Sequence, residues 1–225
     1  MCGRFTLFTA ASRLAEVFLP GEAPSAAPRY NIAPSRPVLT VRVSPSGGRR
    51  EFATPRWGLI PPWAKDASIG NRLINARAET AAEKPSFRRA FRERRCLVPA
   101  DGFYEWKKDV TGKHPFYIHR RDGSPFAFAG IWERWEGIAG EAVETCAILT
   151  TAPNGLLAPL HDRMPVILSP AAYDRWLDPS VRNPELLAPL IGPYPGEELE
   201  AYPVGKAVND PATDDPSCIR PAGTA

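Results

Sequence analysis

The amino-acid sequence predicts an α+β fold, a single domain built on a mostly antiparallel, barrel-like β-sheet with short peripheral helices. The first observation is proline, which supplies 26 of the 225 residues, about twice its average usage, and so favours turns and short strands over long helices. The second is a series of strand-like segments, several of them separated by glycine-containing turns, from residue 95 onward. The third is the absence of internal repeats and long linkers. We therefore expect one domain over residues 1–225, with an irregular C-terminal tail.

The first half of the chain is predicted to alternate short strands with short helices. The predicted elements are a strand at 3–7, a helix at 9–19, a hairpin of strands 38–43 and 50–57, and a basic amphipathic helix at 86–94. Thr9 is a candidate cap for the first helix, which should end before Pro20. Residues 20–37 hold five prolines and are expected to be irregular.

Strands dominate the second half of the chain. They are predicted at 96–99, 103–108, 115–121, 125–135, 142–151 and 164–168. A helix with Pro170 in its first turn is predicted at 169–177.

Composition excludes several classes of protein. The chain is 44% hydrophobic and 24% charged, which is ordinary for a globular protein. No apolar run approaches the roughly 18 residues that a membrane span requires, and polar residues interrupt any secretory signal. We therefore expect a cytoplasmic protein with no membrane partner. The four cysteines form no CxxC pair, so neither a zinc ribbon nor a disulfide framework is expected, and we predict no metal and no cofactor.

The net charge of +3 is too small to indicate a nucleic-acid partner, but the charge is unevenly distributed. Residues 72–95 carry eight basic and three acidic side chains, an excess of +5. Residues 196–225 carry six acidic and two basic side chains, an excess of −4. This pattern fits a polyanionic partner, and a solvated helix face explains the basic stretch equally well.

Cys2 differs from the other cysteines because of its position. Its small side chain permits removal of the initiator Met1, which would leave an α-amine and a thiol on one residue. Such an aminothiol forms an imine with an aldehyde, and the thiol then closes a thiazolidine ring. Reference pKa values of about 8 and 8.5 leave both groups partly available near neutrality, and local charges would raise that fraction. The alternative is an incidental residue at a frayed end.

Three polar segments carry further candidate groups. Asn75 and Arg77 share one side of an extended chain and suit an amine and a phosphate; a helix cap is the alternative for Asn75. Glu105 lies among aromatic residues, so desolvation would raise its pKa toward values useful for proton transfer; the alternative is an exposed strand position. His161, with Arg163 nearby, is placed where a loop meets the sheet and could shuttle a proton. The alternative is a histidine tied to a backbone carbonyl.

Six segments, taken in order, resemble the signature of the SRAP (SOS response-associated peptidase) family of abasic-site processing proteins. They are 1–5 (MCGRF), 29–34 (RYNIAP), 57–61 (WGLIP), 75–80 (NARAET), 103–107 (FYEWK) and 161–165 (HDRMP). The resemblance runs from residue 2 to about residue 210. Members of this family cross-link to abasic sites in single-stranded DNA through an N-terminal cysteine.

The resemblance implies that Cys2 is the nucleophile and supplies both amine and sulfur to a thiazolidine crosslink that shields the lesion. Asn75 would orient the amine or the opened sugar, and Glu105 would act as general acid and base. His161 would assist proton transfer and stabilise the linked sugar. The expected phosphate contacts are Arg4, Arg77 and Arg163, and the expected lining of the DNA path is Asn31, Pro34, Trp63, Trp106 and Thr150.

The resemblance also implies partners. The expected target is single-stranded DNA with abasic sites, including single/double-strand junctions, and the replication machinery is a further expected partner. We expect a monomer that associates with the nucleoid when bound to DNA. Where some bacterial members have a Gly-Trp-Trp block, residues 62–64 read PWA. Trp63 is kept but the second aromatic is not, so an altered junction preference is expected.

Two other functions stay open. An N-terminal-nucleophile amidohydrolase or peptidase would use Cys2 to attack an amide, and the family name records a proposed peptidase activity. Met1 would be removed either by the protein itself or by an aminopeptidase. A non-enzymatic binding module for single-stranded nucleic acid would use basic and aromatic side chains alone. The mass of the product formed with an abasic oligonucleotide distinguishes these functions.

Overall fold

The strands form two sheets in the computed structural model, which describes residues 2–19, 23–137 and 140–223. The smaller sheet contains, in spatial order, β14 (Leu199–Pro203), β9 (Gly112–Arg120), β8 (Gly102–Asp109), β1 (Phe5–Leu7) and β2 (Arg29–Ile32). The larger sheet contains β12 (Met164–Pro165), β11 (Ala142–Thr151), β10 (Phe126–Glu136), β7 (Arg95–Ala100), β3 (Thr40–Val43) and β4 (Arg50–Ala53). It is completed by β13 (Ile167–Leu168) beside β10, and by β5 (Arg56–Trp57) and β6 (Asn75–Arg77) beside β11.

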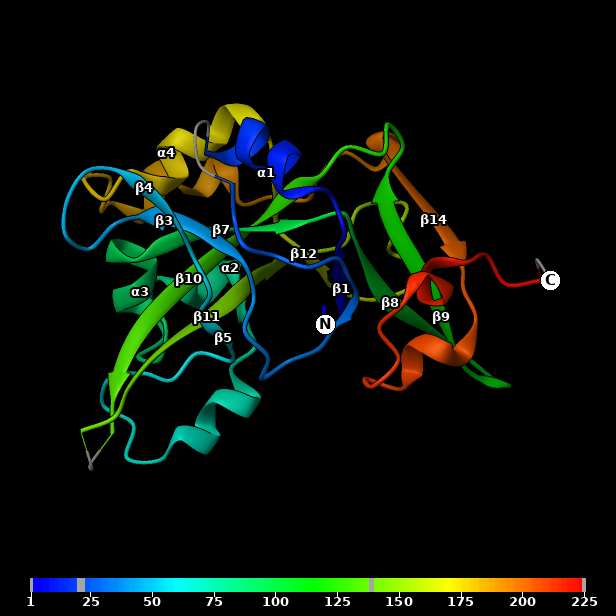
Figure 1. Cartoon of the computed structure of the whole chain (residues 1–225), viewed down its shortest axis with the longest axis horizontal. Coiled ribbons are helices and arrows are strands. Elements are labelled where there is room, and N and C mark those ends of the chain that lie inside the picture. The colour runs from blue at the N-terminus through cyan, green and yellow to red at the C-terminus, as the bar shows by residue number, and fades with distance from the viewer. Residues whose placement is uncertain (1, 20–22, 138–139, 224–225) are drawn as a thin grey trace.

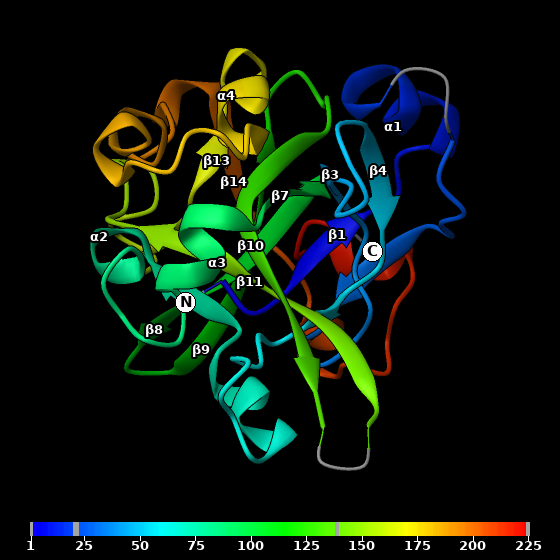
Figure 2. The ribbon, with the colours of Figure 1, turned by 90° about the vertical axis from the view of Figure 1, so that its left-hand side faces the viewer.

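Short helices surround the sheets. The α-helices are α1 (Ala11–Phe18), α2 (Ala78–Ala81), α3 (Arg88–Glu93) and α4 (Tyr173–Leu177). Short 3-10 helices occupy Ala67–Arg72, Pro170–Ala172, Pro184–Leu186, Ala188–Leu190, Gly196–Glu198, Lys206–Asn209 and Pro216–Ile219. Figure 2 shows α3 lying in front of β10 and β11. In the described part of the chain, no helix is long and apolar enough to cross a membrane.

The α+β class predicted from the sequence is confirmed, and the strands pair mostly antiparallel. The sheets are open rather than barrel-like: among the described strands, β2 and β14 end the smaller sheet without pairing to each other. Within the described residues, only β5 and β6 run parallel to their neighbour, β11. Figure 1 shows the two sheets side by side with β1 between them.

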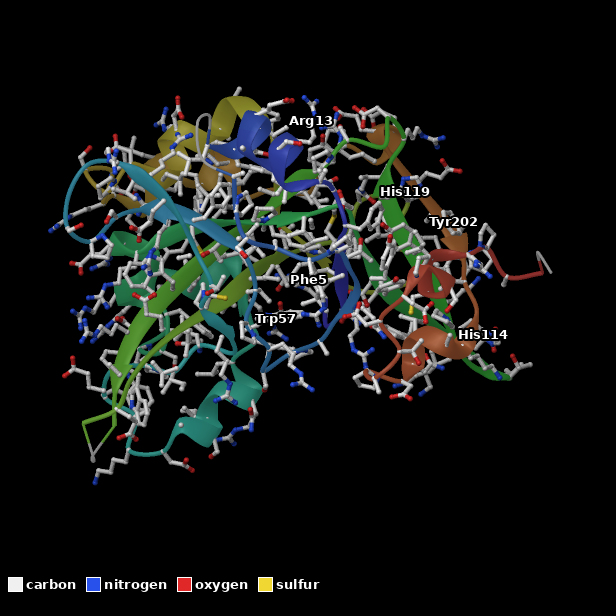
Figure 3. All side chains as sticks on the ribbon, viewed as in Figure 1. Phe5, Arg13, Trp57, His114, His119 and Tyr202 are labelled. Atoms are coloured by element: carbon white, nitrogen blue, oxygen red, sulfur yellow. The ribbon has the colours of Figure 1, made fainter. Side chains whose placement is uncertain are left out.

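The main core lies where β1 meets the larger sheet. Strands β7, β10 and β11 carry near-continuous apolar runs that are buried on both faces, as expected of central strands. The ring of Phe5 on β1 packs edge-on against Trp57 and Phe128, with ring centroids 5.3 and 5.8 Å away, and Figure 3 labels the first two of these residues. Complete burial of such a side chain contributes about 1.5–3 kcal/mol. Phe5 therefore fixes the segment that carries Cys2.

The first helix spans Ala11–Phe18 instead of 9–19. Thr9 does not cap it, because the Thr9 hydroxyl and backbone N–H both donate to the carboxylate of Asp101. The helix has no side-chain cap at Ala10. Residues 20–22, where the sequence predicts its end, lie outside the described residues.

The prediction that residues 20–37 are irregular is wrong at β2, which pairs with β1 through Phe5 and Ile32. The prolines flank this strand instead of interrupting its hydrogen bonds. The predicted strand at 50–57 is divided into β4 and β5, because Pro55 lies between them. Strands β6 and β14 were not predicted, since both are short and only partly apolar.

Candidate active site

Cys2 lies directly before β1, and its side chain is fully buried. Its backbone carbonyl accepts a hydrogen bond of 2.8 Å from Nδ2 of Asn75. The pairing of Phe5 with Phe103 on β8 fixes the chain on the other side. The cysteine is therefore held at both ends of a short segment instead of fraying.

Asn75 occupies the start of β6, opposite Ile148 on β11. It is extended, and the residue that precedes α2 is Arg77, so the helix-cap alternative is wrong. The side-chain oxygen Oδ1 of Asn75 is buried and receives no hydrogen bond from any described residue. Because a buried polar atom without a partner destabilises the fold, this oxygen is a candidate acceptor for a ligand or a reacting amine.

Glu105 lies on β8 with only 2% of its surface exposed, which rules out the exposed strand position. Burial raises the pKa of its carboxyl to about 7, and the negative charge of Asp162 acts in the same direction. The desolvation predicted from the aromatic neighbours is therefore confirmed. A carboxyl with this pKa exchanges protons readily near neutral pH.

His161 lies in the loop that leads into β12, as predicted. Its Nδ1 accepts a hydrogen bond of 3.0 Å from the backbone N–H of Arg163. Oδ1 of Asp162 lies 2.8 Å from the same nitrogen. Burial lowers the pKa of His161, and the charge of Asp162 opposes that shift. The ring is thus held in one orientation.

A cleft of about 540 Å³ opens beside Glu105 and His161. The other residues that line it are Arg4, Trp106, Lys108, Lys113, Leu160 and Asn209. The cleft therefore joins one carboxyl of raised pKa to an imidazole and three cationic side chains. This composition suits an anionic ligand that undergoes proton transfer.

The Cys2 thiol differs from the sequence-based expectation. Burial raises its pKa well above the ordinary value, and the charge of Glu105 adds to the shift. The expected enrichment of thiolate near neutrality is therefore wrong for the chain as described. Cys96 and Cys146 are also buried, and all four cysteines are unpaired.

Two of the three predicted phosphate-binding arginines make internal contacts. Nη1 of Arg4 donates to Oδ1 of Asn31 and to the carbonyl of Val208, at 2.8 and 2.7 Å. Both Nη atoms of Arg163 donate to the carboxylate of Glu79 at 2.7 Å each. Arg77, at the end of β6, is exposed.

The predicted residues of the DNA path are divided between two environments. Asn31 is buried, and its Nδ2 donates to the carbonyls of Val208, Asp210 and Thr213, so it anchors the C-terminal segment. Trp106 lines the cleft, and its Nε1 donates to Oδ1 of Asn209 at 2.8 Å.

The three other predicted residues of the DNA path lie outside the cleft lining. Thr150 is buried on β11, opposite both Arg77 and Pro165. Pro34 is partly exposed in a turn. Trp63 is 56% exposed, which is unusual for its type.

Four polar residues of the site were not predicted: Asp162, Asn209, Lys108 and Lys113. Asp162 adjoins His161 in the sequence, so its charge was a readable signal. The other three enter the cleft through strand register or through a distant C-terminal turn, which no local pattern encodes.

The fold and the site together define a two-sheet α+β protein whose polar cleft is lined by Glu105, a carboxyl that acts electrostatically on the buried thiol of Cys2. This chain belongs to the SOS response associated peptidase (SRAP) family, whose model matches residues 1–211.

Individual relatives agree with this assignment. The chain is 46% identical to the abasic site processing protein YoqW of Bacillus subtilis, over 97% of this chain and 99% of that protein. It is 33% identical to the abasic site processing protein YedK of Escherichia coli, over 86% and 84% of the two chains. A crystal structure of a protein from Bacteroides thetaiotaomicron superposes with a TM-score of 0.87 at 29% identity, covering 98% of this chain and all (100%) of the other.

Proposed function

We propose that this protein recognises abasic sites in single-stranded DNA and links to them covalently through Cys2 once Met1 has been removed. The names of the relatives support the target, since they are abasic site processing proteins. The observation that carries the chemistry is the setting of Cys2. Its carbonyl is anchored by Asn75, and a carboxyl whose pKa is raised to about 7 lies close enough to influence its thiol.

The proposed reaction begins with hydrolysis of the Met1–Cys2 peptide bond, which frees the α-amine. The amine adds to the aldehyde of the ring-opened sugar, and loss of water gives an imine. The thiol then adds across the C=N bond, its proton passing to nitrogen, to form the thiazolidine. The net change is aldehyde plus aminothiol giving thiazolidine plus water.

Each neighbouring group has a role that follows from its environment. Glu105 takes a proton from the ammonium group and returns one to the departing hydroxyl, a cycle that a pKa near 7 allows in both directions. Oδ1 of Asn75, which is buried without a donor, accepts an N–H of the amine. His161, whose ring is held at Nδ1 by the backbone N–H of Arg163 and the carboxylate of Asp162, assists proton transfer and stabilises the opened sugar. Burial keeps the thiol protonated until the imine forms.

The strand-selective part of the proposal concerns Trp63. An exposed indole offers a base a stacking surface that is independent of sequence. This chain has one aromatic side chain where some bacterial members have two. We therefore propose that it unstacks bases at single/double-strand junctions only weakly and acts mainly on single strands. The protein would act as a monomer at sites where replication exposes single-stranded DNA.

The test is intact-protein mass after incubation with an abasic single-stranded oligonucleotide. The wild-type mass should rise by that of the oligonucleotide minus one water. Cys2→Ala should form no thiazolidine and still bind DNA in a salt-sensitive manner. Cys2→Ser, which keeps the amine and lacks the sulfur, should yield only an imine that borohydride traps.

Other outcomes identify the alternatives. Turnover of a small amide without any adduct would assign an N-terminal-nucleophile hydrolase. A wild type that binds DNA without any mass adduct, with the same affinity as Cys2→Ala, would assign a binding module.

A further inference from the structure

We propose that Lys108 and Lys113, on the hairpin formed by β8 and β9, bind a phosphate of the nucleic-acid strand next to the catalytic cleft. This inference rests on the proposed function and adds to it a binding site that the SRAP motifs do not contain. Its ligand is a phosphodiester group, read by charge and independent of base sequence.

The register of the hairpin brings the two lysines together. Lys108 is directly opposite Lys113 in the antiparallel pairing of β8 with β9, so both side chains leave the same face of the hairpin. Opposite residues have Cβ atoms about 4.5–5.5 Å apart, and like charges in this position destabilise the sheet. A phosphate between the two ammonium groups would turn this repulsion into attraction.

In the part of the chain that the structure describes, no carboxylate pairs with these two lysines. Both side chains are exposed, and no ion pair joins either of them to any described residue. The nearest acidic residue in sequence is Asp109, whose carboxylate accepts from the N–H and hydroxyl of Thr111 and lies 3.2 Å from Nε2 of His114. His114, labelled in Figure 3, lies near that end of the hairpin. The charge of Asp109 is therefore engaged within the turn.

Both lysines line the same cleft as Glu105 and His161, so an anion bound by them lies in the cleft that holds these two groups. Arg4 also lines this cleft, but it is engaged by Asn31 and Val208. The pair therefore provides the cleft's uncommitted positive charge. A compact ammonium group suits a phosphate contact that must be made and released as the strand moves.

A second exposed cation lies on the other sheet. Arg77 ends β6, two residues after Asn75, whereas the lysines lie on the smaller sheet beyond Glu105. A strand that contacts both would cross the segment of the protein that holds Cys2. The hairpin tip adds the fully exposed side chain of Val110, which offers an apolar contact to a base.

The experiment compares Lys108→Gln, Lys113→Gln and the double variant with a matched control, Lys107→Gln. Lys107 is exposed on the same hairpin, points to the opposite face and is absent from the cleft. We expect the double variant to bind an undamaged single-stranded oligonucleotide about fivefold more weakly at moderate salt. Its slope of log K against log salt should fall by about 0.7–1, the value for one lost phosphate contact. The control should change less than twofold.

Folding provides an independent readout. Removing the like-charge pair should leave the melting temperature of the double variant unchanged or slightly higher. A lower melting temperature together with weaker binding would indicate a structural role and overturn the proposal. An equal loss of affinity in Lys107→Gln would show that the effect comes from the overall positive charge of the hairpin, and it would also overturn the proposal.

A last comparison separates this inference from the proposed function. Two abasic oligonucleotides carry flanking nucleotides on only the 5′ or only the 3′ side of the lesion. The double variant should slow adduct formation with one of them and react with the other at the wild-type rate. Equal slowing with both would overturn the phosphate site while leaving the crosslinking function intact. Failure of the wild type to form any adduct would overturn the function instead.

Discussion

Arg95 and Glu105 are both almost completely buried, one beneath the helices of the larger sheet and the other beside the cleft. The guanidinium of Arg95 donates to the carbonyls of Trp176, Phe91 and Arg92 at 2.6, 2.9 and 2.8 Å, and also to that of Asp178. These carbonyls lie at or just beyond the C-terminal parts of α3 and α4, where helices leave acceptors without intrahelical donors. Arg95 therefore ties two helices to β7.

Glu105 is in the opposite situation. Burial raises the pKa of its carboxyl to about 7, so the folded chain disfavours the charge that this group carries in water. Burial also lowers the pKa of Arg95, to about 10, yet Arg95 stays charged at neutral pH. Arg95 is thus a buried charge that stabilises the fold, whereas Glu105 is a buried carboxyl whose proton stays exchangeable near neutral pH. Three measurements can break or sharpen this comparison.

The largest effect is expected for Arg95→Met. The variant leaves several buried carbonyls without their donor, and each such group costs about 1–3 kcal/mol. We expect the free energy of unfolding in urea to fall by about 4 kcal/mol. Arg175→Met, an exposed arginine on the neighbouring helix α4, should change it by less than about 0.5 kcal/mol. Similar losses of unfolding free energy in the two variants would contradict the structural role assigned to Arg95.

The next effect concerns the pH dependence of stability. The pKa of Glu105 is raised in the folded chain, so the folded state holds this proton more tightly than the unfolded state does. Its contribution to stability is complete below pH 4.5 and is lost as the pH rises to about 7. Over that range the wild type should lose on the order of 3 kcal/mol more than Glu105→Gln. The measurement is urea unfolding across this range, on proteins in the same state of Met1 processing. Parallel pH profiles of unfolding free energy in the wild type and Glu105→Gln would contradict the raised pKa of Glu105.

The smallest effect in free energy is on the proposed reaction. Glu105→Gln keeps the shape of the side chain and removes its exchangeable proton. Adduct formation with abasic DNA should slow about a hundredfold, within the usual range for loss of a general acid-base group. Affinity for an undamaged strand should stay within twofold of the wild type. A parallel loss of affinity and rate would point to a structural role for Glu105.

The central strands could be predicted because their apolar runs need only local sequence. Phe126–Glu136 and Ala142–Thr151 are found within one or two residues of their predicted bounds. Strand β6 could not be predicted, because its partner β11 lies about 70 residues away. A three-residue strand has no periodicity of its own.

The site divides in the same way. The desolvation of Glu105 was readable from adjacent aromatic residues. The internal partners of the arginines were not, since Glu79 is 84 residues from Arg163 and Val208 is 204 residues from Arg4. The sequence identifies the groups whose chemistry would allow them to act. The pairing of strands and loops in the fold determines which of these groups already have internal hydrogen-bond or ion-pair partners.

The pairing of β1 also fixes a length. Phe5 is held opposite Phe103, and the carbonyl of Cys2 is held by Asn75. One codon inserted between positions 2 and 5 would move the sulfur by about 3.4 Å along the chain, more than a hydrogen bond tolerates. The product of such a frame-preserving insertion would fold around the same core and yet carry its reactive residue out of reach.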